Sequence, residues 1–236
     1  EQVRAGADII KFIATGGVLT PGTDPGAAQL TLEELAAGVA EAARAGRRVA
    51  AHAHGAQGMK NAIRAGVHSI EHGTLLDDEA IGLFLTHRTF LVPTLSAIQS
   101  GCEMGQQGGM PDYAVQKSMA LGGEQRKTFL KAVKAGVRIA MGTDAGTPFN
   151  PHGRNAQELR RMVEFGMTPM QAVEAATRSA ATLLGLESEL GTIEAGKHAD
   201  LILVNGNPLD DIALLQEPTN VVYVIQGGKI AKGPVA

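Results

Sequence analysis

The chain has 236 residues, 44% of them apolar, and a net charge of −3 with acidic and basic side chains interspersed. The length suits one large domain, alone or with a small second one, and the charge pattern excludes a basic stripe for nucleic acid. We find no run long enough to span a membrane and no signal peptide, and the single cysteine, Cys102, excludes an intrachain disulfide. We therefore expect a cytoplasmic protein with no nucleic-acid and no membrane partner.

Residues 9–13, Ile-Ile-Lys-Phe-Ile, predict a buried strand because apolar, mostly β-branched side chains occupy both of its faces. Lys11 belongs to this strand, and an ammonium group in such a place loses its hydration and needs a compensating partner. Asp8 is the only acidic neighbour before Asp24. Lys11 is therefore either a residue without a functional role at a strand end or a residue that takes part in the chemistry of the protein.

A helix-like segment that ends in Ala-Gly and continues into a short apolar run occurs four times, in "RAGADIIKF", "RAGRRVAAHAHG", "RAGVHSIEHG" and "KAGVRIAMGTDAG". Glycine suits the left-handed position just past a helix C-terminus, so each apolar run is predicted to be a strand. The run "RTFLVPTL" at residues 88–95 predicts a fifth strand. Strands that alternate with helices indicate a parallel sheet with crossover helices.

Capping boxes are expected at the start of two helices, with Thr31 and Glu34 in the first and Thr168 and Gln171 in the second. The Gly- and Gln-rich stretch "SGCEMGQQGGMPD", which contains Cys102, predicts a mobile loop. From about residue 186 the pattern changes to short β segments joined by glycine turns. We therefore predict two units, residues 1–185 and residues 186–236.

Four polar residues, Lys11, His52, His72 and Asp144, lie at or near the C-terminal ends of predicted strands. In a (β/α) barrel those ends converge on one face, where active sites are built. Histidine and carboxylate suit a divalent metal such as zinc, whereas a lysine ammonium has no lone pair to offer. A neutral lysine that reacted with carbon dioxide would form a carbamate, an anionic ligand with two oxygens. The pattern thus predicts a metal site that includes a carboxylated lysine.

Less specific candidates lie near these residues. His54 is either a substrate contact or a solvated loop histidine, and His152 and Asn155 either contact substrate or belong to a plain loop. Asp144, taken alone, can also be a turn-capping residue.

The ordered motifs "IIKF", "VAAHAHG", "SIEHGT", "LVPT" and "MGTDAG", followed by "GTIEAGKHADLILVNGNP", resemble the metal-dependent amidohydrolase superfamily. Within it the sequence is most similar to the branch related to Xaa-Pro dipeptidase and imidazolonepropionase. The resemblance implies an α/β fold, a partial (β/α)8 TIM-like barrel of about strands four to eight with a small C-terminal β-sandwich segment.

The same resemblance implies the roles of individual residues. Lys11 would be the carboxylated lysine, His52 and His72 would bind the second metal, and Asp144 would bind the first metal and move protons. The family ligand matches the first histidine of "HAHG", which selects His52 rather than His54.

The family's His-x-His pair on the first barrel strand has no counterpart before Lys11, so two ligands of the first metal are absent from this sequence. One or two ions are compatible with the motifs, and we expect a mononuclear site, with zinc first among the candidate metals. The chain is then a fragment, a reduced fold, or a chain whose missing strands come from a homo-oligomer or a partner.

The leading functional hypothesis is a metal-dependent hydrolase of amide bonds in small substrates such as dipeptides, with Asp144 as proton shuttle. A second is a Schiff-base aldolase acting through Lys11, because "AGADIIKFIATGG" also resembles the lysine strand of deoxyribose-phosphate aldolases. A third is a subunit or truncated form that binds metal with little activity.

Overall fold

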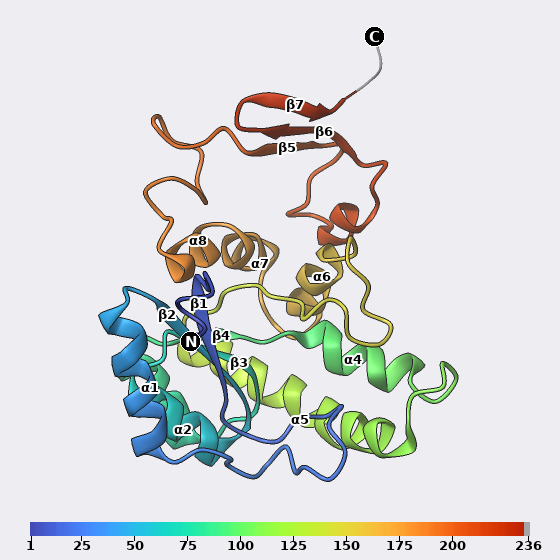
Figure 1. Cartoon of the computed structure of the whole chain (residues 1–236). Coiled ribbons are helices and arrows are strands. Elements are labelled where there is room, and N and C mark those ends of the chain that lie inside the picture. The colour runs from blue at the N-terminus through green and yellow to red at the C-terminus, as the bar shows by residue number, and fades with distance from the viewer. Residues whose placement is uncertain (234–236) are drawn as a thin grey trace.

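The computed structural model describes residues 1–233, which form an α/β architecture with two separate sheets. The first sheet is parallel with strand order β1-β2-β3-β4, and the second is antiparallel with order β5-β6-β7. The elements follow in chain order as β1 (Ile9–Ile13), α1 (Leu32–Arg44), β2 (Arg48–Gly55), α2 (Ala56–Ala65), β3 (Ser69–Leu75), α3 (Asp78–His87), β4 (Phe90–Val92), α4 (Leu95–Met104), α5 (Asp112–Ala135), α6 (Ala156–Glu164), α7 (Pro169–Ala176), α8 (Arg178–Leu184), β5 (Leu201–Val204), the 3-10 helix η1 (Ile212–Gln216), β6 (Val221–Gln226) and β7 (Lys229–Lys232). Figure 1 shows α6, α7 and α8 between the two sheets.

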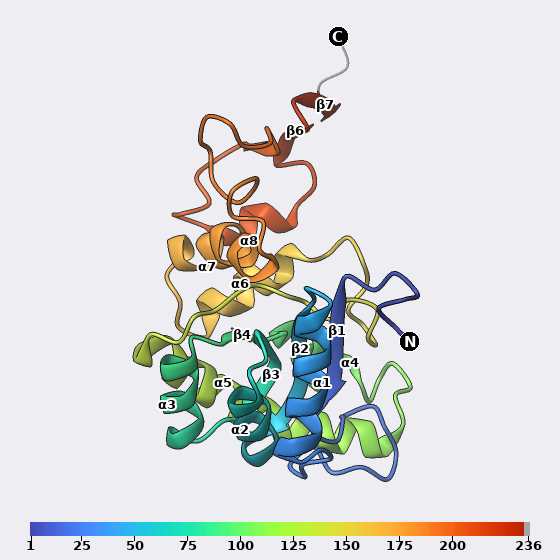
Figure 2. The ribbon, with the colours of Figure 1, turned by 60° about the vertical axis from the view of Figure 1, so that its left-hand side comes forward.

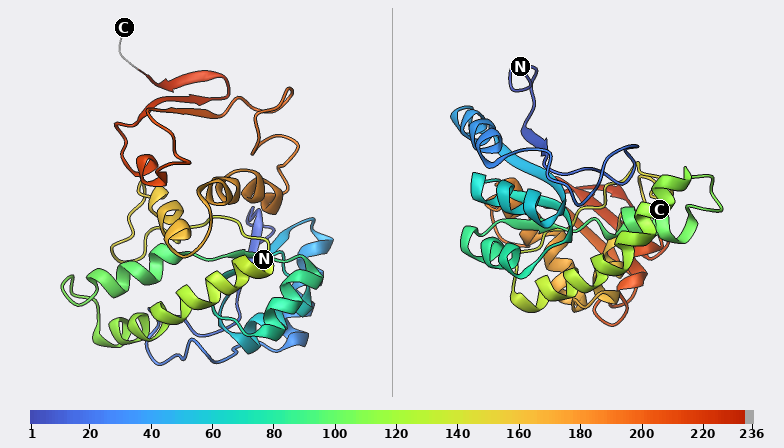
Figure 3. Two further views of the ribbon diagram at one scale, coloured as in Figure 1. Left: turned by 180° about the vertical axis from the view of Figure 1, so that it is seen from behind. Right: turned by 90° about the horizontal axis from the view of Figure 1, so that it is seen from below.

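The core lies between the parallel sheet and the helices that cover one of its faces. Helices α1, α2 and α3 stand side by side against this face (Figures 2 and 3). Leu35, Met59, Phe84 and Phe129 are its largest fully buried apolar side chains. Each contributes roughly 1.5–3 kcal/mol through removal of apolar surface from water, so this layer fixes the frame on which the strand ends are held.

The predicted helix boundaries are largely confirmed. Both capping boxes form, at Thr31 before α1 and at Thr168 before α7, with the reciprocal hydrogen bonds from Glu34 and Gln171. The glycines that follow α2 and α5 are left-handed, as the Ala-Gly pattern predicts.

The strand that carries Lys11 is not buried on both faces, so that prediction is wrong. Ile10 and Phe12 pack against the core, whereas Lys11 is exposed and Ile9 and Ile13 keep 44% and 49% of their surface accessible. Within residues 1–233, β1 is an edge strand that pairs with β2. Ile10 and Phe12 point to the face that the core covers, whereas Lys11 and its neighbours on the other face border two cavities.

The strand expected after α5 is reduced to a single parallel bridge between Ile139 and Leu91. Leu91 donates its N–H to the carbonyl of Arg138, and Ala140 donates to the carbonyl of Leu91. The next residue, Met141, donates its N–H to the carbonyl of Ala175 on α7, at 2.9 Å. The chain leaves the sheet at that point, which ends strand pairing.

Cys102 lies in helix α4 rather than in the mobile loop that the Gly-rich sequence predicts. Its thiol is 3.1 Å from the carbonyl of Ser118 on α5. A side chain at Gly122 would collide with the Cys102 sulfur, at 2.7 Å from its Cβ. The glycines of this region therefore allow two helices to approach closely.

The short C-terminal β segments that the sequence predicts are present, and they form a three-stranded antiparallel sheet. Ile202, Leu203 and Ile230 on this sheet are 54%, 48% and 67% exposed. The boundary near residue 186 remains a prediction. No helix within residues 1–233 is long and apolar enough to cross a membrane.

Candidate functional site

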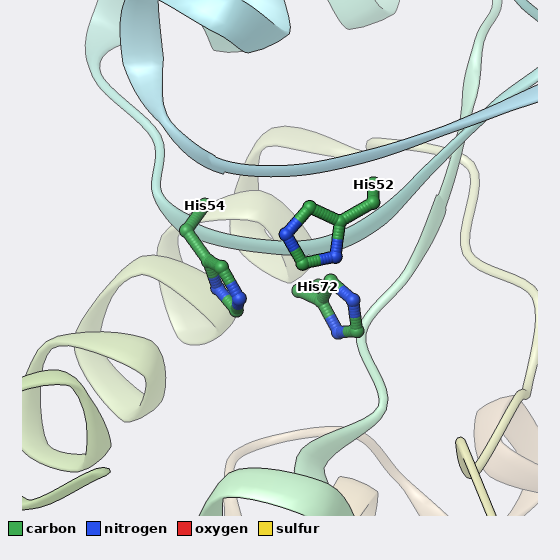
Figure 4. A group of neighbouring side chains, drawn as sticks. All are labelled: His52, His54 and His72. Carbon is green, nitrogen blue, oxygen red and sulfur yellow. The ribbon is translucent and has the colours of Figure 1, made fainter. Parts of the chain in front are cut away.

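Three histidines converge at the C-terminal ends of two neighbouring strands. His52 and His54 come from β2 and His72 comes from β3, and one nitrogen of each ring lies within 4.8 Å of the others. The ring centroids are 4.6–4.8 Å apart, and the rings of His54 and His72 are stacked. Figure 4 shows the three rings directed toward one another.

An irregularity in the sheet produces this convergence. His52 and His54 share a face of β2 because side chains two residues apart point the same way. In the regular register His52 lies opposite Glu71, and His72 lies opposite Ala53. Ala53 points to the face of the sheet opposite to that of His52 and His54. The register shifts after Ala53, and the backbone of His72 is left-handed, with φ 75°. This local break re-aims the His72 ring toward the two histidines of β2.

Each histidine uses one ring nitrogen in a hydrogen bond to the protein. Nε2 of His52 lies 3.2 Å from the carbonyl oxygen of Gly16, and a carbonyl only accepts, so this nitrogen carries the proton. Nδ1 of His54 lies 2.9 Å from the hydroxyl of Thr74, and Nδ1 of His72 lies 2.6 Å from the hydroxyl of Thr94. The nitrogens left for a ligand are Nδ1 of His52 and Nε2 of the other two.

Burial keeps all three imidazoles neutral near pH 7. It lowers the pKa of His54 to about 3, with a further lowering from the neighbouring His52. Burial also lowers the pKa of His72 well below its ordinary value, and the pKa of His52 is lowered by burial and by Lys11, against the opposing effect of its bond to Gly16. A neutral imidazole offers the lone pair that a metal requires.

The histidines open into a cavity of about 300 Å³ that Lys11 and Asp144 also line. Apolar side chains form much of the remaining wall, among them Ile13, Leu19, Ile98, Met110 and Pro148. The structure thus brings Lys11, His52, His54, His72 and Asp144 to one cavity, and the close group of nitrogens within it consists of the three histidines.

Asp144 is carried on a tight loop whose geometry is set by Asn150. The backbone of Asp144 is left-handed, with φ 54°. The side-chain amide of Asn150, which is buried, donates to the carbonyls of Thr143 and Asp144 at 2.7 and 3.1 Å. Sequence analysis missed Asn150, because an asparagine after a glycine-rich turn gives no sign of the carbonyls it will reach.

Glu71 is a second residue that sequence analysis missed. It borders a hollow next to the histidine cavity together with Lys11, and the hydroxyl of Ser69 donates to its carboxylate at 2.6 Å. Burial raises the pKa of Glu71, while the Ser69 bond and the positive charge of Lys11 act in the opposite direction. Another strand therefore brings a carboxylate near Lys11 in addition to Asp8, its only acidic neighbour in the local sequence.

The weaker candidates separate into two groups. His54 is only 2% exposed, so the solvated-loop alternative for it is wrong. His152 and Asn155 are exposed and do not line the histidine cavity; His152 borders a different hollow beside η1. The structure does not bring these two residues to the cluster.

A divalent metal fits this donor set. Three neutral nitrogens face a common space, and a carboxylate, Asp144, lines the same cavity. Nitrogen and carboxylate donors in this number suit zinc and its neighbours among the first-row metals.

Comparison with known proteins identifies the family of the chain. Residues 1–231 match the amidohydrolase family. Ochratoxinase from Aspergillus niger is 41% identical over 235 residues, which cover 99% of this chain and 48% of that protein. The crystal structure of a Xaa-Pro dipeptidase with bound methionine superposes with a TM-score of 0.93 at 45% identity, over 98% of this chain and 56% of the other. A prolidase complexed with N-methylphosphonate-L-proline gives a TM-score of 0.92 at 33% identity, with coverage of 98% and 56%.

The chain spans about half the length of the curated relatives it matches, with 48% of the ochratoxinase covered. The match nevertheless runs through nearly all of the described residues and includes the histidine strands. The chain therefore belongs to the amidohydrolase family.

Proposed function

We propose that this protein is a metal-dependent hydrolase of amide bonds in small substrates such as dipeptides. The observation that carries the proposal is the convergence of His52, His54 and His72 in a cavity that Lys11 and Asp144 also line. The names of its relatives, an ochratoxinase and a Xaa-Pro dipeptidase, support the same class of reaction. They favour hydrolysis over the Schiff-base aldolase alternative, which has no use for three neutral imidazoles.

Lys11, His52, His72 and Asp144 would hold a single divalent ion, for which zinc is our first choice. His54 then lies beside the ligands as a substrate contact. Lys11 would contribute oxygen ligands if it were carboxylated, and its exposure gives carbon dioxide access to the amine. The ion would supply an activated water at neutral pH and polarise the scissile carbonyl.

The chain's own residues would divide the remaining work. Asp144 would accept a proton at its carboxylate and return it to the nitrogen of the leaving amine. The apolar wall of Leu19, Ile98 and Met110 would bind a hydrophobic substrate side chain and exclude water around it. Since the histidines are held by hydrogen bonds to Gly16, Thr74 and Thr94, they would keep their orientation through the reaction.

Metal removal tests this proposal. We expect amide hydrolysis by the purified chain to stop after chelation and dialysis, and to return when zinc, manganese or cobalt is added back. Dipeptides with a large apolar first residue should be hydrolysed faster than those with a charged one. Hydrolysis that persists unchanged in a sample shown to be free of metal would rule the proposal out.

We further propose that a partial barrel of about strands four to eight forms here, with a second copy or a partner chain supplying the remaining strands. The support is the unpaired edge of β1 with Ile9 and Ile13 exposed beside it, since such edges favour association. Light scattering of the purified chain should show an oligomer, and Ile13→Lys should shift it toward the monomer. A monodisperse wild-type monomer would contradict this.

If the chain alone binds metal but does not turn over, and gains activity only with that partner, the split-enzyme alternative is favoured. The division at residues 185 and 186 and the cytoplasmic location stay predictions from the sequence.

A further inference from the structure

Thr94, the last residue of the motif "LVPT", occupies an unusual position. It precedes α4 as its N-cap residue, is 3% exposed, and has a left-handed backbone with φ 45° and ψ 46°. This conformation is costly for a β-branched residue and persists only where the surroundings enforce it.

The side chain of Thr94 does not perform the usual task of an N-cap threonine. Such a hydroxyl normally accepts a hydrogen bond from a backbone N–H in the first turn of its helix. In α4 no side-chain capping bond is formed by Thr94, and its hydroxyl lies instead 2.6 Å from Nδ1 of His72. The hydroxyl of Thr94 thus contacts His72 instead of the first turn of α4.

Glu158 on α6 takes over the capping of α4. Its two carboxylate oxygens accept the N–H groups of Leu95 and Ser96, both at 2.7 Å, and the residue is fully buried. Burying a carboxylate is expensive unless hydrogen bonds compensate for the lost water. The carboxylate of Glu158 therefore provides the N-terminal cap of α4 that the Thr94 side chain does not provide.

The same helix also holds the other end of α4. Arg161 of α6 binds Glu103 through two hydrogen bonds of 2.9 and 2.8 Å. Helix α4 is thus fixed at both ends, and its inner side, which includes Ala97 and Ile98, forms part of the cavity wall. Because Thr94 is the N-cap residue of α4, the contact between its hydroxyl and His72 depends on the position of this helix.

We propose that Thr94 and Glu158 form a positioning pair. Glu158 caps α4, and this leaves the Thr94 hydroxyl free to accept a hydrogen bond from the Nδ1–H group of His72. Nε2 of His72 is then the unprotonated nitrogen. Neither residue contacts the reacting atoms. The consequence for the metal rests on the proposed function, whereas the orientation of His72 does not.

The test uses the metal-free chain and its zinc affinity together. Long-range ¹H–¹⁵N spectra of the imidazoles report which nitrogen of His72 is protonated, with the signal assigned from His72→Gln. We expect wild type and Thr94→Ser to show Nδ1–H, and Thr94→Val to lose this preference. Zinc affinity, measured by competition with a chelator, should fall roughly 10–100-fold in Thr94→Val and stay within about threefold in Thr94→Ser.

Glu158→Gln should shift the His72 spectrum in the same direction as Thr94→Val. Because the two residues act through one contact, the double variant should lose no more zinc affinity than Thr94→Val alone. Thr89→Val is the matched control, since Thr89 is a buried threonine whose hydroxyl donates to the carbonyl of Val67, at 3.4 Å, and which does not line the histidine cavity. It should change neither readout.

The outcomes separate this inference from the proposed function. An Nε2–H tautomer of His72 in the wild type, or an unchanged spectrum and affinity in Thr94→Val, would overturn the positioning pair while zinc binding itself stands. A wild-type chain that binds no zinc but shows the Nδ1–H tautomer, lost in Thr94→Val, would refute the metal site and keep the pair. If Glu158→Gln does not fold, Thr94→Val and Thr94→Ser decide the question.

Discussion

Replacing His72 with alanine is expected to remove stoichiometric zinc binding from the folded chain. The substitution deletes one of three nitrogens that lie within 4.8 Å of one another. The loss should exceed the roughly 10–100-fold that changes to outer hydrogen-bond partners cause. A competition titration with a chromophoric chelator measures it.

His87→Ala is the control for this experiment, because His87 ends α3 at the surface and lies outside the cavity. Its affinity should equal that of the wild type. Parallel titration of His52→Ala and His54→Ala tests the predicted choice between those two residues, and His52→Ala should cost more. Wild-type affinity in His72→Ala would show that the cluster is not a metal site.

Replacing Asp144 with asparagine is expected to lower kcat by about 10²–10⁴-fold, the range that a general acid–base residue contributes. Asparagine keeps an oxygen donor of the same size, but it cannot accept a proton near neutral pH. Zinc affinity should therefore fall much less than kcat. Initial rates on a dipeptide, together with the chelator titration, measure the two effects separately.

Asp210→Asn provides the matched control, since Asp210 is exposed near the C-terminal sheet and lies outside the cavity. It should leave both quantities unchanged. If Asp144→Asn retains the wild-type kcat, Asp144 does not move the proton, and the mechanism proposed for this cavity is wrong. If zinc affinity falls as steeply as kcat, its main role is that of a ligand.

The sequence predicted the residues of the cavity better than their surroundings. The polar residues predicted at strand ends, Lys11, His52, His72 and Asp144, do line one cavity. For the two histidines this follows because parallel strands end on a common edge, whereas Asp144 lies on a loop after a single bridge. The exposure of Lys11 could not be predicted from the sequence. Apolar residues occur on both faces of β1, but the sequence does not show whether other elements pack against both of these faces. That depends on neighbouring strands and helices.

The contacts that orient the histidines were beyond sequence reasoning. Nothing in the sequence shows that Glu158 reaches the first turn of α4, 62 and 63 residues before it. The left-handed backbone of His72 is equally hidden, because histidine tolerates this conformation only where the fold imposes it. The motif "LVPT" contains Thr94, but it does not indicate which residues Thr94 contacts.

Helix α4 illustrates a different limit. Its last residues, 100–104, begin the Gly- and Gln-rich stretch that predicts a loop, yet they are helical. Packing against α5 decides the outcome, because Gly101 and Gly122 let the two helices approach where larger side chains would collide. Local propensity is a weak prior when tertiary packing opposes it.

The most direct test of the metal site is an anomalous difference map from crystals of this chain grown with zinc. We expect one strong peak about 2 Å from Nδ1 of His52 and Nε2 of His72, with density beyond Nζ of Lys11 if that amine is carboxylated. A well-ordered crystal with the three rings in place and no anomalous peak within bonding reach of them would contradict the proposed metal centre.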